Sequence, residues 1–397
     1  MTATAPIDAT ARPGEGRDAP LRTHPRVAVL AYLAATLLGV VMRFELVGMS
    51  FGIDFDHLLH AHSHTLYFGW AGLGLLAVAR TRFREVTAPM RWSVAGLVAL
   101  TPLLFLGFLA TGYHPFTIAI STVVMLGWYV VAMGWWRQLA SVDHVVAVAF
   151  RYGLVYLVGS SLGIWALAAV QATEGPALAE NLAIHAFLAG FGWFFVFAVV
   201  GALLIHEDRL GLNLARTDVT RVLHWWAALA WITFPLGVVG GPEVWMLGPA
   251  ARIAGLVSIV PGLWWVSLMW RGTHTSRNRL VLRSAALWFG LATLTTGTAA
   301  VLGSAALTAG GRQGVVIHLH ALFAGFVTPL LAMALSRTVA GYALVAHHGA
   351  LGVMLAGLVL VALGWVTVGM WVAAIGAVAL WLAGVRWSAP IARESQP

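Results

Sequence analysis

Histidine is the residue type through which this chain is best equipped to do chemistry. The sequence holds 15 histidines in 397 residues and has no cysteine. Without cysteine it can form no disulfide, no thiolate-bound iron–sulfur cluster and no covalently attached c-type heme. Any metal or heme iron would have to be held by histidine, carboxylate or methionine side chains.

Three groups of histidines stand at the start of long apolar segments, and they are the candidate ligands. These groups are His60-Ala-His62-Ser-His64, His185 and His318-Leu-His320. Imidazole in a hydrocarbon environment is costly unless it is hydrogen-bonded or ligated. Hydrogen bonds between helices, worth about 0.6 kcal/mol each, would explain one or two such residues but not six at one depth.

The spacing within these groups limits which sites they can form. His318 and His320 are two residues apart, so on a helix they point about 200° apart and can serve two sites but not one ion. His62 points away from His60 and His64 and is free to be a single axial ligand. His60 and His64 have the i, i+4 spacing that can hold a metal ion. Nearby glycines and aromatic residues either let helices pack closely or leave room for a flat macrocycle.

The elements that position these residues are predicted to be transmembrane helices. The chain is 60% hydrophobic and 10% charged, with a mean hydropathy of +0.85. This composition excludes a soluble enzyme, a nucleic-acid-binding protein and a disordered chain. A helix needs about 20 apolar residues to cross a bilayer. We therefore expect an all-α, polytopic integral membrane bundle of about twelve transmembrane helices, near 27–48, 60–79, 92–112, 116–136, 146–171, 182–205, 222–240, 250–270, 280–306, 316–336, 343–363 and 366–385.

The distribution of charge predicts the orientation of these helices. All 23 basic residues are arginine, and about twenty of them fall on one side of the predicted membrane. Arg43, Arg252 and Arg312 are left on the other side. The positive-inside rule then places both termini in the cytoplasm of a bacterial or archaeal cell, with the chain in the inner membrane. We expect a cytoplasmic polar tail at 1–24, one transmembrane domain at 25–387 and a cytoplasmic tail at 388–397.

A tandem pair, His347–His348, resembles a metal-binding pair but is predicted to serve another purpose. On the expected topology it lies near the cytoplasmic surface, roughly 25–30 Å from the layer of His318. We expect it to be an interfacial pair.

Together these residues resemble the catalytic subunit of the heme–copper oxidase superfamily, especially its cbb-type oxidase and nitric oxide reductase branches. The string His62-Ser-His64-Thr-Leu-Tyr-Phe-Gly-Trp is similar to that family's His-Thr-Asn segment, in which the first histidine ligates the low-spin heme. His318-Leu-His320-Ala-Leu-Phe-Ala-Gly-Phe is similar to its His-x-His segment. The resemblance implies two b-type hemes, with His62 and His320 as ligands of the low-spin heme and His318 as ligand of the high-spin heme.

The resemblance also implies a third metal and a reaction. His185-Ala-Phe-Leu-Ala-Gly-Phe is similar to the segment that carries one ligand of the non-heme metal. Where the family has a histidine pair for copper, this chain has Glu243 and Val244, so non-heme iron held by His185 and Glu243 suits the site better than copper. The implied function is an oxidoreductase that passes electrons from a quinol, or from a donor subunit or carrier, to gaseous nitric oxide or dioxygen. Arg252 and Arg312 are candidates for binding heme propionates.

Two alternatives are consistent with the same residues. NnrS-type heme proteins, which are linked to nitric oxide stress, have similar His-Ala-His and His-Ala-Leu segments, here His60-Ala-His62 and His320-Ala-Leu. That resemblance implies heme binding without respiratory turnover. A metal- or proton-coupled transporter would also use histidines within the membrane. Carboxylates within the predicted spans are nearly absent, which speaks against the transporter.

Overall fold

The computed structural model describes residues 19–172, 177–239, 247–302, 305–336, 339 and 341–394. This part of the chain contains helices and no strands. The helices, with their bounds, are α1 (Ala19–Leu46), α2 (Phe55–His64), η1 (Thr65–Gly72), α3 (Leu73–Ala79), α4 (Ala88–Thr111), α5 (Pro115–Gln138), η2 (Leu139–Ser141), α6 (His144–Ala172), α7 (Ala177–Ile205), α8 (Glu207–Leu210), α9 (Arg216–Val239), α10 (Leu247–Gly272), α11 (Arg279–Leu302), α12 (Ala305–His320), η3 (Ala321–Val327), α13 (Thr328–Leu335), α14 (Gly341–Ala362) and α15 (Val366–Glu394).

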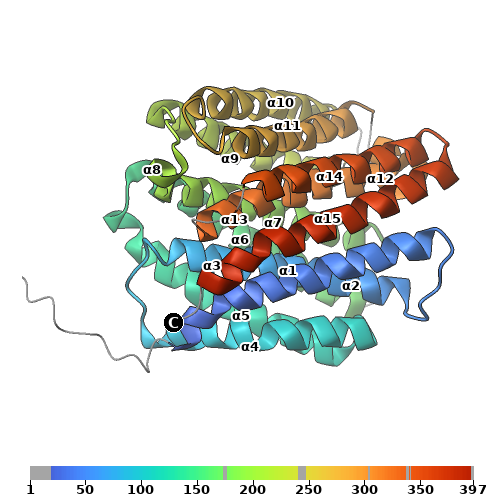
Figure 1. The fold of residues 1–397 in the computed structure, drawn as a ribbon, viewed down its shortest axis with the longest axis horizontal. Helices are drawn as coiled ribbons and strands as arrows, with labels where there is room; N and C mark the ends of the chain where they lie inside the picture. The colour runs from blue at the N-terminus through green and yellow to red at the C-terminus, as the bar shows by residue number, and fades with distance from the viewer. Residues whose placement is uncertain are drawn as a thin grey trace, which may run out of the picture.

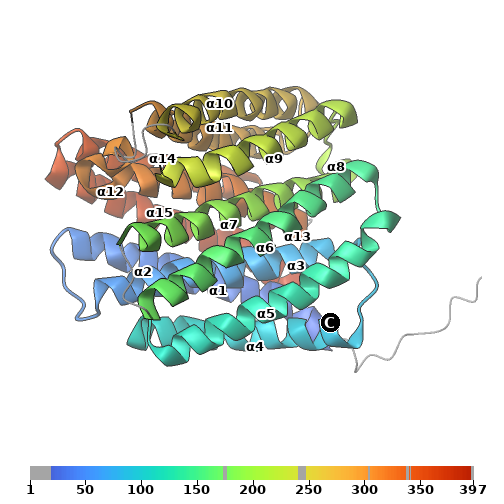
Figure 2. The ribbon, with the colours of Figure 1, turned by 180° about the vertical axis from the view of Figure 1, so that it is seen from behind.

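The long helices run side by side along one common direction (Figure 1). The α10–α11 pair forms one edge of the bundle and the α4–α5 pair the opposite edge, with the other helices between them (Figures 1 and 2). Helix α1 begins, and α15 ends, at the end of the bundle that carries α8 (Figure 1). We call this the arginine end, because Arg80, Arg209 and Arg216 lie there. The opposite end, where α1 ends and α2 begins, is the histidine end.

Apolar surface supports a membrane environment for this bundle. Among the described residues, eight helices are long and apolar enough to cross a membrane. Large apolar side chains face outward along their length, among them Trp92, Leu162 and Leu363, which are 77%, 66% and 70% exposed. A soluble protein would not leave so many large apolar groups in water, whereas lipid accepts them. The chain is therefore an all-helical, multi-pass membrane protein.

Aromatic side chains fill the interior between the helices. Trp70, Trp128, Trp226 and Trp265 are fully buried. The indole N–H of Trp70 donates to the hydroxyl of Thr328 at 2.9 Å, which links η1 to α13. Buried tryptophan usually needs such a partner for its N–H.

Two helices change their winding directly after a histidine group. The π-helical segment η1 follows His64, and the π-helical segment η3 follows His320. A π-helix makes i→i+5 hydrogen bonds, is rare and occurs mostly at functional sites. The helices on either side, α2 with α3 and α12 with α13, continue the same course, so each π segment lies inside one long helical stretch.

The bounds of the predicted tails differ from those of the helices. Helix α1 begins at Ala19, inside the predicted tail 1–24. Helix α15 passes the predicted boundary at residue 387 and ends at Glu394. Ser388 and Ile391 are buried, so packing against the bundle extends this helix beyond the point where composition alone suggested a tail.

Candidate functional site

The rings of His62 and His320 lie next to each other at the histidine end. Their centroids are 6.3 Å apart and their planes are inclined by 21°. His62 comes from α2 and His320 from the last turn of α12, so the pair joins two segments that are far apart in sequence. Both side chains are half-buried.

Hydrogen bonds determine which nitrogen of each ring carries the proton. Nδ1 of His62 lies 2.7 Å from the carbonyl oxygen of Ala35, and Nδ1 of His320 lies 2.8 Å from that of Val316. A carbonyl oxygen only accepts, so Nδ1–H is the donor in both cases. Nε2 of each ring then keeps its lone pair, and among the described residues nothing donates to it. A histidine that ligates a metal typically has this arrangement, with its other N–H on a backbone carbonyl.

His318 has the same arrangement on the other side of its helix. Its Nδ1 lies 3.0 Å from the carbonyl oxygen of Ala292 and 3.0 Å from the hydroxyl oxygen of Thr295, both on α11. His320 meets α2 and His318 meets α11, so the two rings do face different neighbours, as their spacing predicts. Within the described part of the chain, Nε2 of His318 also has no donor.

His64, in the same group as His62, has the lone pair of its ring occupied. Nδ1–H of His64 donates to the carbonyl of His60 at 3.0 Å, and its Nε2 accepts from the hydroxyl of Tyr113 at 3.4 Å. His60 lies against the ring of Tyr113, with centroids 4.3 Å apart. Over the described residues, no group of three or more His, Cys, Asp or Glu side chains could hold a metal ion. The predicted metal site at His60 and His64 therefore has no third protein ligand there.

The tandem pair His347–His348 lies inside the protein, which corrects the interfacial placement. Both rings are buried. Nε2–H of His347 donates to the carbonyl of Ala324 in η3 at 2.8 Å, and its Nδ1 accepts from the indole of Trp387 at 3.4 Å. Nδ1 of His348 accepts from the indole of Trp288 at 3.0 Å. His347 is six residues, or about 9 Å, into α14. That depth brings it within reach of η3, instead of the predicted 25–30 Å from the His318 layer.

Four of the predicted site residues have side chains outside the described part of the structure. Glu243 lies in the stretch 240–246, outside the described residues. His185, Arg252 and Arg312 lie on α7, α10 and α12, but their side chains are not among those described. Their predicted roles stay predictions.

Sequence reasoning did not single out the part of α1 that supports His62. A Cβ placed on Gly39 would lie 3.0 Å from Cε1 of His62, so the absence of a side chain lets the ring approach the helix. One turn earlier, the carbonyl of Ala35 accepts the His62 hydrogen bond. The glycines near the histidines in sequence serve packing instead, since Gly69 lies against Ala31 and Gly325 against Trp288.

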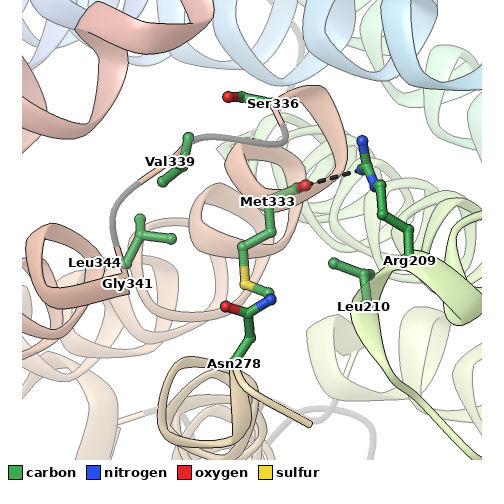
Figure 3. A pocket seen from close by; sticks show the side chains of 8 residues that line it. All are labelled: Arg209, Leu210, Asn278, Met333, Ser336, Val339, Gly341 and Leu344. Atoms are coloured by element: carbon green, nitrogen blue, oxygen red, sulfur yellow. Dashed lines mark hydrogen bonds between the residues drawn. The ribbon is translucent and has the colours of Figure 1, made fainter.

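A pocket lies at the arginine end (Figure 3). It has a volume of about 200 Å³ and is lined by residues of α8, α13 and α14 together with Asn278, Ser336 and Val339. Small-molecule sites usually measure about 300–1,000 Å³. The guanidinium of Arg209 donates to the carbonyls of Met333 at 2.9 Å and Ala334 at 2.6 Å, at the end of α13 (Figure 3). Because it satisfies carbonyls left open at a helix end, we assign the cation a capping role.

Comparison with known proteins adds no assignment. No protein-family model matches the sequence, and no curated protein matches it either. Conclusions about function therefore rest on the geometry of the residues themselves.

Proposed function

We propose that this protein binds a low-spin b-type heme between His62 and His320. The observation that carries the proposal is the separation of their rings. With a metal–nitrogen bond of about 2.0–2.1 Å and Nε2 roughly 1.1 Å from the ring centroid, two imidazoles on opposite sides of one metal have centroids about 6.3 Å apart. The separation between His62 and His320 is 6.3 Å.

Residues around the pair are suited to hold this group. The backbone carbonyls of Ala35 and Val316 fix the protons on Nδ1, which presents both Nε2 atoms as ligands. His62 and His320 would together hold the iron, and a heme held by two histidines would supply electron transfer without a free position for a gas. Toward the arginine end, the rings of Tyr67 and Phe323 contact each other with centroids 4.9 Å apart, and they would close the site on that side.

We further propose a second heme on His318. Its Nδ1 is held by Ala292 and Thr295 of α11, which leaves Nε2 of the same ring as the candidate ligand atom. One axial histidine leaves a coordination position for a diatomic gas. The protein would then be an oxidoreductase of the inner membrane that delivers electrons from a quinol or a donor protein to nitric oxide or dioxygen. His185 and Glu243 are the sequence-based candidates for a non-heme iron or copper site beside it.

The proposal includes the topology expected from the sequence. The start of α1 and the end of α15 lie at the same end of the bundle, the arginine end (Figure 1). Twelve spans with both termini in the cytoplasm would put the two heme sites toward the outer face of the membrane.

An optical spectrum of the protein purified in detergent tests the proposal. We expect b-type bands in the reduced-minus-oxidised difference spectrum and two hemes per chain by pyridine hemochrome assay. His62→Ala and His320→Ala should each remove the low-spin heme, and His318→Ala the other one. His60→Ala is the matched control, because His60 lies in the same group without contacting His320. A colourless protein, or a spectrum unchanged in both His62→Ala and His320→Ala, would overturn the proposal and favour the transporter.

A further inference from the structure

Arg43 carries a buried positive charge for which the described part of the chain offers no anion. It stands in the last turn of α1 and is 9% exposed. The ion pairs among the described residues are Arg216–Asp143, Arg216–Glu207 and Arg221–Asp218, and Arg43 takes part in none of them. Nor does it form a side-chain hydrogen bond there. An arginine inside a membrane protein is costly unless it is paired, so a partner for this charge is expected.

The position of Arg43 indicates where that partner would be. Ala35, Gly39 and Arg43 follow one another at intervals of four residues and therefore share one face of α1. Ala35 accepts the hydrogen bond of His62, and Gly39 lies against its ring, so this face is turned toward His62. Arg43 stands one turn, or about 6 Å, beyond Gly39 along the helix.

We infer that the guanidinium of Arg43 binds a propionate carboxylate of the heme held by His62 and His320. This inference rests on the proposed function. The heme brings two carboxylates on one edge of its ring, and the planar fork of a guanidinium matches a carboxylate with two parallel hydrogen bonds. The pairing neutralises the buried cation. It also orients the macrocycle, with the propionate edge toward the end of α1.

The inference adds a residue to the sequence-based candidates. Arg252 and Arg312 were expected to bind propionates, and their side chains lie outside the described residues. Arg43 is on the same predicted side of the membrane, and its side chain is described and buried on the face of α1 that is turned toward His62. Its role is that of a binding and orienting residue.

Comparing two forms of the ligand tests this directly. The full-length chain, prepared without heme, is titrated with hemin and with hemin dimethyl ester, whose propionates are neutral. Hydrogen bonds to charged groups strengthen binding by about ten- to a hundredfold. We expect the wild-type chain to prefer hemin over the ester by this factor. In Arg43→Gln the preference should fall toward one, while Arg43→Lys should keep part of it.

A matched control and a second measurement separate this role from a structural one. Arg137 also stands in the last turn of a long helix but is exposed, so Arg137→Gln should keep the full preference. In Arg43→Gln the reduction midpoint potential of the low-spin heme should fall, because an uncompensated carboxylate near the iron stabilises the ferric state. If Arg43→Gln does not fold, Arg43→Lys and the two ligands on the wild-type chain still give the comparison.

Each outcome of the titration has a separate meaning. If the wild-type chain binds neither ligand, the proposed function fails. If it binds hemin and the ester equally, the heme site stands and the inference about a propionate partner is wrong. If wild type and Arg43→Gln prefer hemin by the same factor, another group binds the propionates and the role of Arg43 is overturned.

Discussion

The two histidine pairs of this protein use their nitrogens in opposite ways. In His62 and His320 the backbone takes up the Nδ1 protons and leaves both Nε2 lone pairs without a donor among the described residues. In His347 and His348 an indole N–H occupies a lone pair on each ring. The planes of the first pair are inclined by 21°, and those of the second by 83°.

This difference separates histidines that hold the fold together from histidines available to a ligand. Burial does not identify the pair that is available to a ligand, since the tandem pair His347–His348 is the more buried one. Adjacency of two histidines in the sequence does not identify that pair either. The useful criterion is whether the protein has already used the lone pair, because an occupied nitrogen cannot ligate a metal. By the same criterion Arg209, which caps α13, is structural, and Arg43 is available.

The largest effect is expected from removing His347 in the chain prepared without heme. His347→Ala would leave the Ala324 carbonyl and the Trp387 indole without their buried partner and would also create a cavity. These losses together should lower the free energy of unfolding by about 3–5 kcal/mol. His62→Ala should cost only about 1 kcal/mol in the same preparation, because it loses one hydrogen bond. Unfolding followed by tryptophan fluorescence measures both.

A conservative variant sharpens this result. His347→Gln retains a side-chain N–H that can donate to Ala324, so it should recover part of the lost stability. Equal destabilisation by His347→Ala and His62→Ala would break the distinction between the two pairs.

The second effect concerns the space beside His62. A side chain at position 39 would press on Cε1 of the ring, and overpacking of this kind costs about 1–3 kcal/mol. Gly39→Val should therefore weaken heme binding by roughly five- to a hundredfold and convert part of the low-spin spectrum into a high-spin spectrum. Gly96→Val is the control, because a Cβ at Gly96 meets nothing within 4 Å. An unchanged low-spin spectrum in Gly39→Val would contradict the close approach of α1 to the ring.

A smaller effect is expected at His318. Thr295→Val removes the hydroxyl beside Nδ1 of His318 and should reduce the free energy that holds this ring in place by about 0.5–1.5 kcal/mol. The fraction of heme that binds carbon monoxide should then fall by a few-fold, without change in the low-spin bands. Thr298→Val is a matched control, since that hydroxyl on the same helix donates to the Leu294 carbonyl at 2.9 Å and not to a partner of His318. If the two variants behave alike, Thr295 does not support a ligand.

The smallest effect is expected from an ion pair at the arginine end, where charges are paired within the chain. Burial raises the pKa of Glu207, although Arg216 beside it acts in the opposite direction. A raised pKa means that the folded state binds the proton more tightly than the unfolded state does. Stability from this group is therefore fully present below its ordinary pKa of about 4.5 and is lost as the pH rises through the raised value.

Glu207→Gln should flatten this part of the stability profile and change stability by less than about 1 kcal/mol at neutral pH. Thermal unfolding between pH 4 and 8, about half a unit apart, measures the slope. Asp218→Asn, which removes another carboxylate near an arginine, is the comparison variant. A profile of Glu207→Gln that is as steep as that of the wild type would assign the slope to other groups.

Much of the architecture follows from the sequence, because the lengths of the apolar segments determine where the long helices form. Each range predicted as a span falls largely within a helix or a run of consecutive helical segments, and the divergence of His318 and His320 follows from helix geometry alone. Among the described residues, eight helices are long and apolar enough to cross a membrane, so the number of twelve spans stays a prediction. Depth is harder to predict: the sequence places His347 near the membrane surface because it stands close to the start of an apolar segment, whereas α14 begins six residues before it.

The supporting residues could not be predicted because they depend on contacts between segments. Nothing in the sequence around Gly39 and Arg43 indicates that the face of α1 that carries these two residues packs against α2. The π segments are equally hidden, since the residue types of Thr65–Gly72 and Ala321–Val327 do not by themselves distinguish π from α winding. A contact such as that of His347 with the Ala324 carbonyl in η3 comes from a distant segment and is visible only in the structure.

Each π segment accommodates about one extra residue in its helix, directly beside a histidine group. One residue corresponds to about 100° of turn in an α-helix, and a π segment takes up such a residue without shifting the side chains beyond it. Deleting a single residue from Thr65–Gly72 would therefore restore ordinary winding there and leave His62 in its orientation relative to α3, whereas a deletion from the ordinary helix α3 would turn the residues on either side of it by about 100° relative to each other. Each bulge thus lets one more residue stand beside the histidines without turning their imidazoles.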